Sequence, residues 1–191
     1  MPLSPPVARE HIHTRIVECR GFRREDGLWD IEGHITDVKT YAFGNHFRGE
    51  IPAGTPVHDM WLRLTVDDRL TIHEVEAVTE ASPYEACPNV APNFARLKGL
   101  RIRPGFQAEV RSRLGGTEGC THLVELLVPV ATTAYQTVFP YRERQRREQE
   151  KAEGKPRERP SRRPPLLDTC HAFASDGELV KRYWPDFYTG S

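Results

Sequence analysis

The sequence lacks the features that mark several large classes of protein. No apolar run approaches the roughly 18 residues that a membrane-spanning helix needs. The opening stretch MPLSPPVARE has no apolar core of the kind found in secretory signal peptides, so we expect a cytoplasmic protein. An excess of either charge is also missing, because 27 Lys and Arg balance 27 Asp and Glu. This balance argues against the basic field of a nucleic-acid binder, and we predict neither membrane nor nucleic-acid partners.

Cysteine is scarce and widely spaced. The chain has four cysteines and no CxxC pair, which excludes a compact disulfide framework and a zinc knuckle built on two tight turns. In a reducing compartment such residues are free thiols, metal ligands or core side chains. The four are Cys19, Cys87, Cys120 and Cys170.

The first half of the chain carries the alternating pattern of β-strands. Around residues 28–37 apolar and polar residues alternate, which places one set on each face of an extended chain. Residues 58–79 predict a hairpin that turns at Asp67 and Asp68. A change of phase near His73 indicates either a β-bulge or a strand buried on both faces. The apolar residues that we predict to face the core are Trp29, Ile31, Ile35, Met60, Leu62, Leu64 and Val66.

Beyond residue 80 the apolar pattern takes the period of helices. A first short helix is predicted to end at Gly99, and a second covers residues 104–116. A third begins in the segment GCTHLVELL, residues 119–127. Pro129 is predicted to bend this helix or break it into two pieces.

The last quarter of the chain changes composition twice. Residues 141–165 form a charged, proline-rich arm, whose first part can continue as a solvated helix and whose second part reads as a linker or disordered. Residues 166–191 return to apolar and aromatic side chains, and the turn SDGE predicts a terminal hairpin that packs on the body. With a flexible N-terminus at 1–10 and a core at 11–140, the prediction is an α+β fold in which helices cover one face of an antiparallel sheet.

The segment GCTHLVELL places a thiol and an imidazole at the start of a predicted helix. Unpaired N–H groups and the positive dipole end favour a thiolate at Cys120, which can be a nucleophile or a metal ligand. Within an ideal helix His122 would point about 200° away, so the two side chains converge only if Cys120 lies in the cap. Glu125 shares the helix face of His122 and is predicted to fix its tautomer. The alternative is a small buried cysteine beside a partly exposed polar histidine.

Cys87 is the candidate that would join them. It lies in the proline-rich loop PYEACPNVAP, and loops often display functional side chains. Cys87, Cys120 and His122 would occupy three corners of a tetrahedral metal site, with a carboxylate or water as the fourth ligand. Zinc or an iron centre is the cofactor that such a set predicts.

Two other polar groups have simpler explanations. Asp30, Glu32 and His34 alternate along one predicted strand, about 7 Å apart, which suits a pair of catalytic carboxylates. A sheet face open to water explains the same pattern without a function, and we favour it. His58 and Asp59 are adjacent, so on a strand they face opposite ways and are not expected to act together.

Several motifs together resemble a bacterial family known as domain of unknown function 2889. These are DGLWDIEGHITD, PAGTPVHDMWLRLTVD, GCTHLVELLVPVATTAYQT and LDTCHAFASDGE, and the resemblance extends from about residue 12 to about residue 188 outside the arm. It implies a bacterial protein without an established activity, whose motifs include the positions of Cys87, Cys120 and His122. Residues 60–135 are also loosely similar to NifU-like iron–sulfur scaffolds, which implies thiols at Cys87 and Cys120 in a scaffold-like fold.

Three functions are open on this sequence. The first is a thiol and imidazole metal-binding site in a scaffold-like fold. The second is a small enzyme that acts on a catabolic metabolite, with Cys120 as nucleophile and His122 as base. The third is a non-catalytic interaction module that engages a protein partner through residues 141–165. The sequence does not decide whether the protein is an enzyme, nor its oligomeric state.

Overall fold

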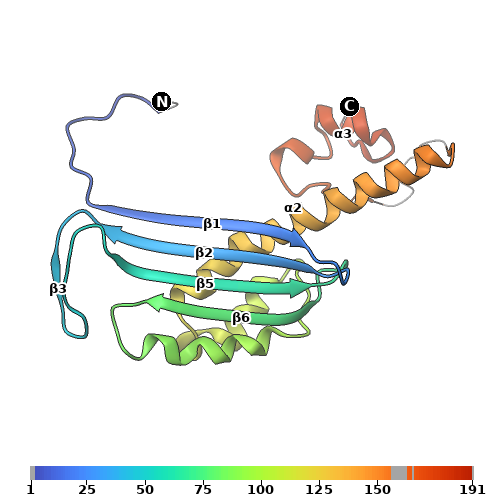
Figure 1. Ribbon diagram of the computed structural model, residues 1–191. Coiled ribbons are helices and arrows are strands. Elements are labelled where there is room, and N and C mark those ends of the chain that lie inside the picture. Colours follow the sequence, from blue (N-terminus) through green and yellow to red (C-terminus); the bar gives the residue numbers. More distant parts are fainter. Residues whose placement is uncertain (1–2, 156–162, 165, 191) are drawn as a thin grey trace. The chain divides into compact units, whose positions relative to one another are not determined.

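The computed structural model describes residues 3–155, 163–164 and 166–190, and the chain divides into two compact units, Met1–Glu143 and Arg144–Ser191. The first unit holds a four-stranded antiparallel sheet of order β1-β2-β5-β6 and a separate two-stranded sheet, β3-β4 (Figure 1). The strands are β1 (His13–Arg23), β2 (Trp29–Lys39), β3 (Phe43–Asn45), β4 (Gly49–Ile51), β5 (Pro56–Val66) and β6 (Ile72–Ala81).

Helices of the first unit cover one face of the larger sheet and leave the other face open (Figure 1). This arrangement confirms the predicted α+β class. The helices, with η marking 3-10 helices, are η1 (Cys87–Leu97), α1 (Phe106–Leu114), η2 (Gly116–Glu118), α2 (Thr121–Ala152), η3 (His171–Phe173), α3 (Glu178–Tyr183) and η4 (Pro185–Phe187).

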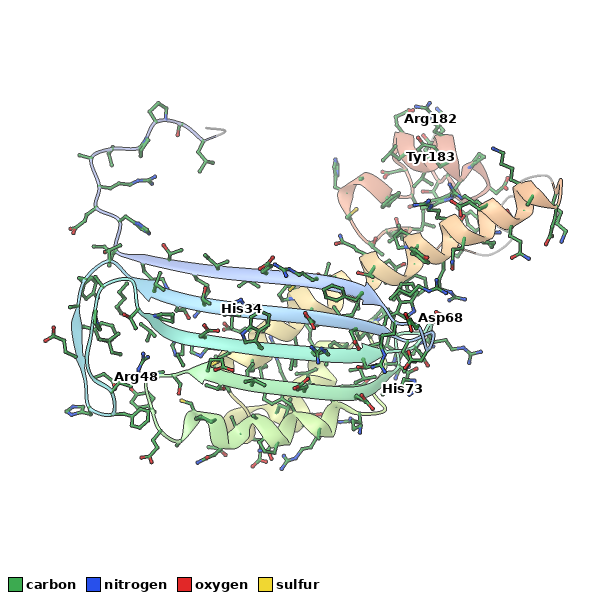
Figure 2. The ribbon with its side chains drawn as sticks, viewed as in Figure 1. His34, Arg48, Asp68, His73, Arg182 and Tyr183 are labelled. Atoms are coloured by element: carbon green, nitrogen blue, oxygen red, sulfur yellow. The ribbon has the colours of Figure 1, made fainter. Side chains whose placement is uncertain are left out.

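The predicted hairpin and its bulge are both confirmed. β5 and β6 pair antiparallel around a turn closed by Asp67, whose carboxylate accepts hydrogen bonds from the backbone N–H groups of Arg69 and Thr71. Thr65 pairs with Glu74 and the next residue pairs with Ile72, so His73 is the extra residue of a β-bulge. Figure 2 shows His73 at this end of β6.

The core lies between the covered sheet face and the helices. It contains every apolar strand residue that the alternation assigned to the inside, together with one face of η1, α1 and the first half of α2. Burying this much apolar surface is the main stabilising contribution to such a fold. The helical members are Phe94, Leu97, Phe106, Val110, Leu114, Leu123, Leu126, Leu127, Val130, Ala134 and Val138.

Of the two effects predicted for Pro129, a bend or a break, the break is wrong. α2 continues through Pro129 and Pro140 to Ala152. A proline removes one backbone donor, but the turns around Pro129 keep their place because Leu126, Leu127 and Val130 are buried against the sheet. Tertiary packing therefore outweighs the loss of one helical hydrogen bond at Pro129.

The first part of the charged arm is helical, as predicted. Arg144 and Arg146 form ion pairs with residues four positions on, Glu148 and Glu150, which is a geometry that supports an exposed helix. The predicted linker lies mostly at residues 156–162 and 165, outside the described residues.

The predicted C-terminal hairpin is wrong, because the described part of this segment forms short helices. Phe173 stacks on Trp184 with ring centroids 5.2 Å apart, and Val180 is fully buried in the same unit. Val180 and Trp184 are four residues apart, a helical spacing that the alternating interpretation overlooked. Glu178 in the first turn of α3 and Lys181 in the last also complement the helix dipole.

None of the helices in the described residues is both long enough and apolar enough to cross a membrane.

We predict that Gly33→Ala destabilises the protein, because β2 and α2 approach most closely there. A Cβ atom at Gly33 would lie 2.5 Å from Val130 Cγ2 and 3.0 Å from Leu126 Cγ. Overpacking of this kind costs roughly 1–3 kcal/mol. Urea unfolding measures the change, and Gly44→Ala is the matched control because its Cβ would meet nothing within 4 Å. Equal stabilities of the two variants would contradict this packing.

Candidate functional site

A buried carboxylate marks the candidate site. On β2 the residues Ile31, Ile35 and Asp37 share the covered face, because side chains alternate along a strand. The alternation thus carries an acidic side chain into the apolar face, where the Asp37 side chain is 2% exposed. A charge in such a place is tolerated only when it is paired and hydrogen-bonded.

Three residues on the two neighbouring strands form hydrogen bonds with the carboxylate of Asp37. Arg15 of β1 donates from Nε to Oδ1 at 2.8 Å and from Nη2 to Oδ2 at 2.9 Å, a two-point contact. His13 Nε2 lies 2.9 Å from Oδ1, and His58 Nδ1 lies 3.1 Å from Oδ2. Burial alone would raise the pKa of Asp37, but hydrogen bonds from Arg15 and His13 and the positive charges nearby outweigh it and lower the pKa to about 2. Asp37 is therefore ionised at neutral pH.

The ionised carboxylate fixes the tautomer of His58. Asp37 can only accept hydrogen bonds, so His58 Nδ1 carries the proton and donates it. In the neutral ring the lone pair is then on Nε2. The two residues are direct cross-strand partners of β2 and β5, so the sheet register itself places them together.

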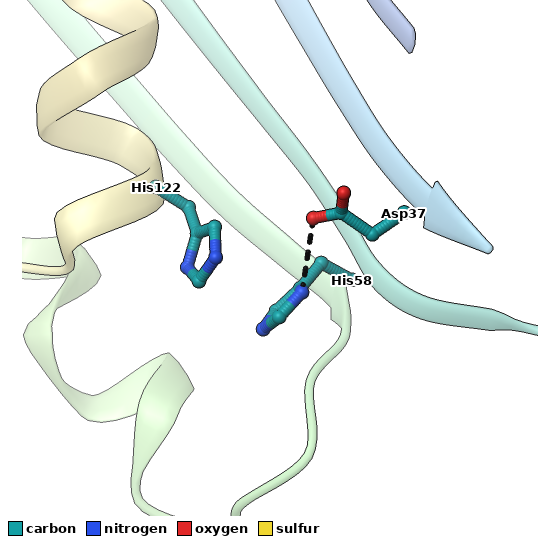
Figure 3. A group of neighbouring side chains, drawn as sticks. All are labelled: Asp37, His58 and His122. Atoms are coloured by element: carbon teal, nitrogen blue, oxygen red, sulfur yellow. Dashed lines mark hydrogen bonds and ion pairs between the residues drawn. The ribbon is translucent and has the colours of Figure 1, made fainter. Parts of the chain in front are cut away.

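His122 of α2 lies against His58 (Figure 3). The ring centroids are 3.8 Å apart, and the ring planes are tilted by 34°. Burial and the neighbouring His122 lower the pKa of His58; burial and the charge of Arg15 lower the pKa of His122. Because both pKa values are lowered from the ordinary value of a histidine, the neutral form of each ring, with a lone pair to offer, is favoured at pH 7.

Asp37, His58 and His122 form a group whose candidate ligand atoms all lie within 4.8 Å of one another. In the described residues it is the only group of at least three acidic, histidine or cysteine side chains that meets this criterion. Both oxygens of Asp37 are already occupied by Arg15. Asp37 therefore suits the role of a carboxylate that orients His58 by a hydrogen bond, as the hydrogen-bond partners of metal-binding histidines do.

Cys120 lies at the N-cap of α2, which is the condition under which the sequence predicts that it meets His122. Its carbonyl accepts the first helical hydrogen bond, from Val124 N at 2.9 Å, while α2 begins at Thr121. The Cys120 Sγ atom lies 3.9 Å from His122 Nδ1 and 3.9 Å from Met60 Sδ. The thiol is half-buried, with the core on one side and the imidazole on the other.

The structure gives Glu125 a different neighbour from the one expected. Its carboxylate contacts Arg15 Nη1 at 3.5 Å and makes no hydrogen bond to His122 within the described residues. The carboxylate that orients an imidazole here is Asp37, and the imidazole is His58. Glu125 still adds negative charge near His122.

Cys87 begins η1 and is half-buried. No disulfide or hydrogen bond joins its side chain to Cys120 within the residues that the structure describes, and the compact group of candidate ligands excludes both cysteines. The set of Cys87, Cys120 and His122 stays a prediction.

Sequence reasoning missed Asp37, His58, His13 and Arg15. One signal was available for Asp37, which is in phase with Ile31 and Ile35 although it is acidic. The expectation that His58 and Asp59 do not act together agrees with the structure: His58 pairs with Asp37 on the covered face. Asp59 pairs on the open face with His34, with Asp59 Oδ1 2.8 Å from His34 Nε2. Figure 2 shows His34 on β2. The open face carries polar side chains, as the water-facing interpretation of Asp30, Glu32 and His34 requires.

A cavity of about 260 Å³ lies beside the site, between α1 and the first turns of α2. Gly119, Thr121 and Glu125 line it, but Cys120 and His122 do not. It offers room next to the cysteine and does not open directly onto the imidazoles.

We predict that Asp37→Asn lowers the free energy of unfolding by about 2 kcal/mol at pH 7, the amount that corresponds to a pKa reduced from 3.8 to about 2. Since the folded-state pKa is the lower one, the stabilisation is complete above about pH 4 and is lost as the pH falls toward 2. The difference between wild type and variant should therefore shrink over that range in urea unfolding at several pH values. Asp59→Asn, in the more exposed pair with His34, is the control and should change stability much less.

Comparison with known proteins gives a family and no function. The model of the family described as "Protein of unknown function (DUF2889)" matches residues 13–136, a range that contains Asp37, His58, Cys120 and His122. No curated protein and no solved structure matches the chain. The likeness to NifU-like scaffolds has no support from these comparisons and stays a prediction. Since the match spans more than half of the 191 residues, the chain belongs to the DUF2889 family.

Proposed function

We propose that this protein binds a transition-metal ion, zinc in the first place, through His58, His122 and Cys120. The observation that carries the proposal is the convergence of two neutral imidazoles beneath the sheet, with nitrogen atoms inside a 4.8 Å group. Metal ligation requires neutral imidazoles, and the lowered pKa values of both rings favour that state. Nitrogen and sulfur donors together suit zinc or an iron centre better than magnesium or calcium.

The distance between Cys120 and His122 is compatible with one ion. Cys120 lies outside the group of ligand atoms within 4.8 Å of one another, so it must move toward His58 for all three side chains to bind the same ion. Tetrahedral zinc with Zn–S of about 2.3 Å and Zn–N of about 2.0 Å holds sulfur and nitrogen about 3.5 Å apart. The Cys120 Sγ to His122 Nδ1 distance of 3.9 Å is within a few tenths of an ångström of this value. The two rings are close to stacked, so one must turn for both lone pairs to point at the ion. His58 is held by Asp37, and the adjustment falls on His122, whose only hydrogen-bonding contact in the described residues is the thiol.

Asp37 would act on the metal through His58. Its hydrogen bond to Nδ1 leaves Nε2 as the ligand atom and makes the ring a better donor. Three protein ligands leave one coordination position for water or a small ligand, which is the arrangement of catalytic rather than structural zinc sites. A cytoplasmic location, which stays a prediction, would keep the thiol reduced and able to bind.

We predict that the full-length protein binds one equivalent of zinc and that His58→Ala and His122→Ala each weaken binding by roughly 100-fold or more. Asp37→Asn should weaken it by about 10- to 100-fold, the range seen for outer partners of metal ligands. Competition with a chromophoric chelator measures these affinities. His34→Ala is the matched control, because His34 also pairs with an aspartate but lies on the open face. Unchanged affinity in both site variants would refute the proposal.

The pH dependence of binding has a defined sign. Protonation of either imidazole removes a ligand, and the pKa values of both imidazoles are lowered. Because the Cys120 thiol must release its proton to bind zinc, the affinity of the wild type should fall steadily as the pH falls from 8. In Cys120→Ser no thiol proton is released, so the residual affinity should be maintained from pH 8 to about 7 and decline only where the imidazoles become protonated. The same pH dependence in the wild type and in Cys120→Ser would exclude the thiol as a ligand.

A second candidate function is favoured by the position of Cys120. A thiol at a helix N-cap, 3.9 Å from an imidazole nitrogen, is the arrangement of a cysteine nucleophile with its base. In this function His122 would take the thiol proton, and Asp37 would act on the neighbouring ring of His58.

Alkylation of Cys120 separates the two functions. If Cys120 is a metal ligand, we predict that one equivalent of zinc slows its reaction with iodoacetamide by at least about tenfold, because a bound thiolate is protected. The same zinc should give no protection in His58→Ala. Mass spectrometry of the peptides reports each cysteine, and Cys170 is the exposed control. Fast alkylation that zinc does not affect, and that His122→Ala slows, would favour the nucleophile.

A further inference from the structure

Strand β1 is an open edge of the larger sheet. All of its residues from His13 to Arg23 pair with β2, and β1 is the terminal strand in the order β1-β2-β5-β6 (Figure 1). Within residues 3–143 no strand pairs with its other side. The opposite edge is covered in part, because Leu100 and Gly99 hydrogen-bond to Ile72 and an isolated bridge joins Thr71 to Arg101.

This edge is neither short nor interrupted by proline. It spans 11 residues, and Ile16, Val17 and Phe22 are 57%, 44% and 45% exposed. Native proteins generally shorten such edges, interrupt them, charge them or cover them, because unpaired backbone groups invite another strand, and β1 has only the charged side chains. A long edge with exposed apolar side chains therefore indicates a partner strand.

We propose that the partner is β1 of a second copy, paired antiparallel about a two-fold axis that passes between the two Cys19 residues. The strand is self-complementary in this register. Glu18 and Arg20 form an ion pair within one copy, with Arg20 Nη2 2.6 Å from Glu18 Oε1. In the dimer Glu18 also lies opposite Arg20 of the second copy, which brings the two ion pairs together in alternating charge. Ile16 lies opposite Phe22, and by symmetry each pair occurs twice. Opposite charges and aromatic with β-branched pairs are the cross-strand combinations that stabilise a sheet.

All four of these side chains belong to the open face of the sheet. Ile16, Glu18, Arg20 and Phe22 are the alternate residues of β1 whose partners on β2 are Thr36, His34, Glu32 and Asp30. The dimer would form a continuous eight-stranded sheet, so the helices would stay on one side and the open face on the other.

Neighbouring registers are worse. A two-residue shift that centres the axis on Glu18 places two glutamates opposite each other, and the shift that centres it on Arg20 does the same with two arginines. In the proposed register Arg15 lies opposite Arg23, but the carboxylate of Asp37 compensates the charge of Arg15 within its own copy. Among the described residues, Glu18 and Arg20 have no such buried carboxylate or cation beside them, so the like-charge pairs of the other registers cost more.

Charge exchange at two positions tests the register. In the full-length wild type, sedimentation equilibrium should give twice the chain mass of 21.8 kDa. Glu18→Arg and Arg20→Glu each create two like-charge pairs and should raise the dissociation constant at least about tenfold. The double variant restores opposite pairs in exchanged order and should return to the wild-type dissociation constant. Glu74→Arg on β6 is the control for charge reversal on the open face and should leave the dimer intact.

Amide hydrogen exchange supplies the second readout. Backbone amides of residues 13–23 should be protected in the wild type and exchange faster in the two single variants, while β5 stays protected in all. A wild type that remains monomeric throughout a concentration series would overturn the proposal. So would a dimer that both single variants preserve, since its interface would then lie elsewhere.

Discussion

The carboxylate of Asp37 lies on the covered side of the sheet, and its compensation organises the candidate site. Removing a charge from water costs several kcal/mol unless hydrogen bonds and an opposite charge replace the solvent. Arg15 and His13 from β1 and His58 from β5 provide that compensation across both neighbours of β2. One acidic residue thereby holds the Arg15 side chain in place and determines the tautomer of His58. Its hydrogen bonds also join β1, β2 and β5 at this end of the sheet. Without it, Arg15 would be left partly buried without its two-point partner.

The position of α2 depends on its packing against the same covered face of the sheet. Its first half lies against the inner face closely enough that Gly33 has no room for a side chain, and this approach brings the helix start to the strand ends where Asp37 and His58 lie. His122, in the first turn of α2, then faces His58, and the N-cap places Cys120 beside His122. The packing of apolar residues thus positions the polar groups of the site. Such coupling is how a rigid scaffold presents a site.

Metal binding and thiol chemistry share the first requirements of this site. Both need neutral imidazoles at pH 7, and both gain from an ionised carboxylate that holds one ring in a single tautomer. They differ in what Cys120 does, as ligand or as nucleophile. The family match names a group of proteins without an activity, so it is the arrangement of these side chains that supports a function.

The sequence by itself determined the class of the fold, because hydrophobic periodicity is local. Alternation in β2 and β5, the bulge at His73 and the helical stripe of α2 follow from residues a few positions apart. It also located Cys120 and His122 at a helix start, and it stated the cap geometry under which they meet. It failed at the C-terminal segment, where the short apolar runs fit either a strand or one turn of helix and tertiary contacts chose the helix.

Only the tertiary structure decided the composition of the site. Asp37, His58 and His122 are separated by 21 and 64 positions in the chain, and no local pattern indicates that they meet. Their contact arises from the register of β2 against β5 and from the approach of α2 to the covered face. Register is set by the whole core, since a shift of one residue would move Asp37 to the open face and the apolar residues with it. The sequence specifies which faces must be buried, and the burial then brings the imidazoles together.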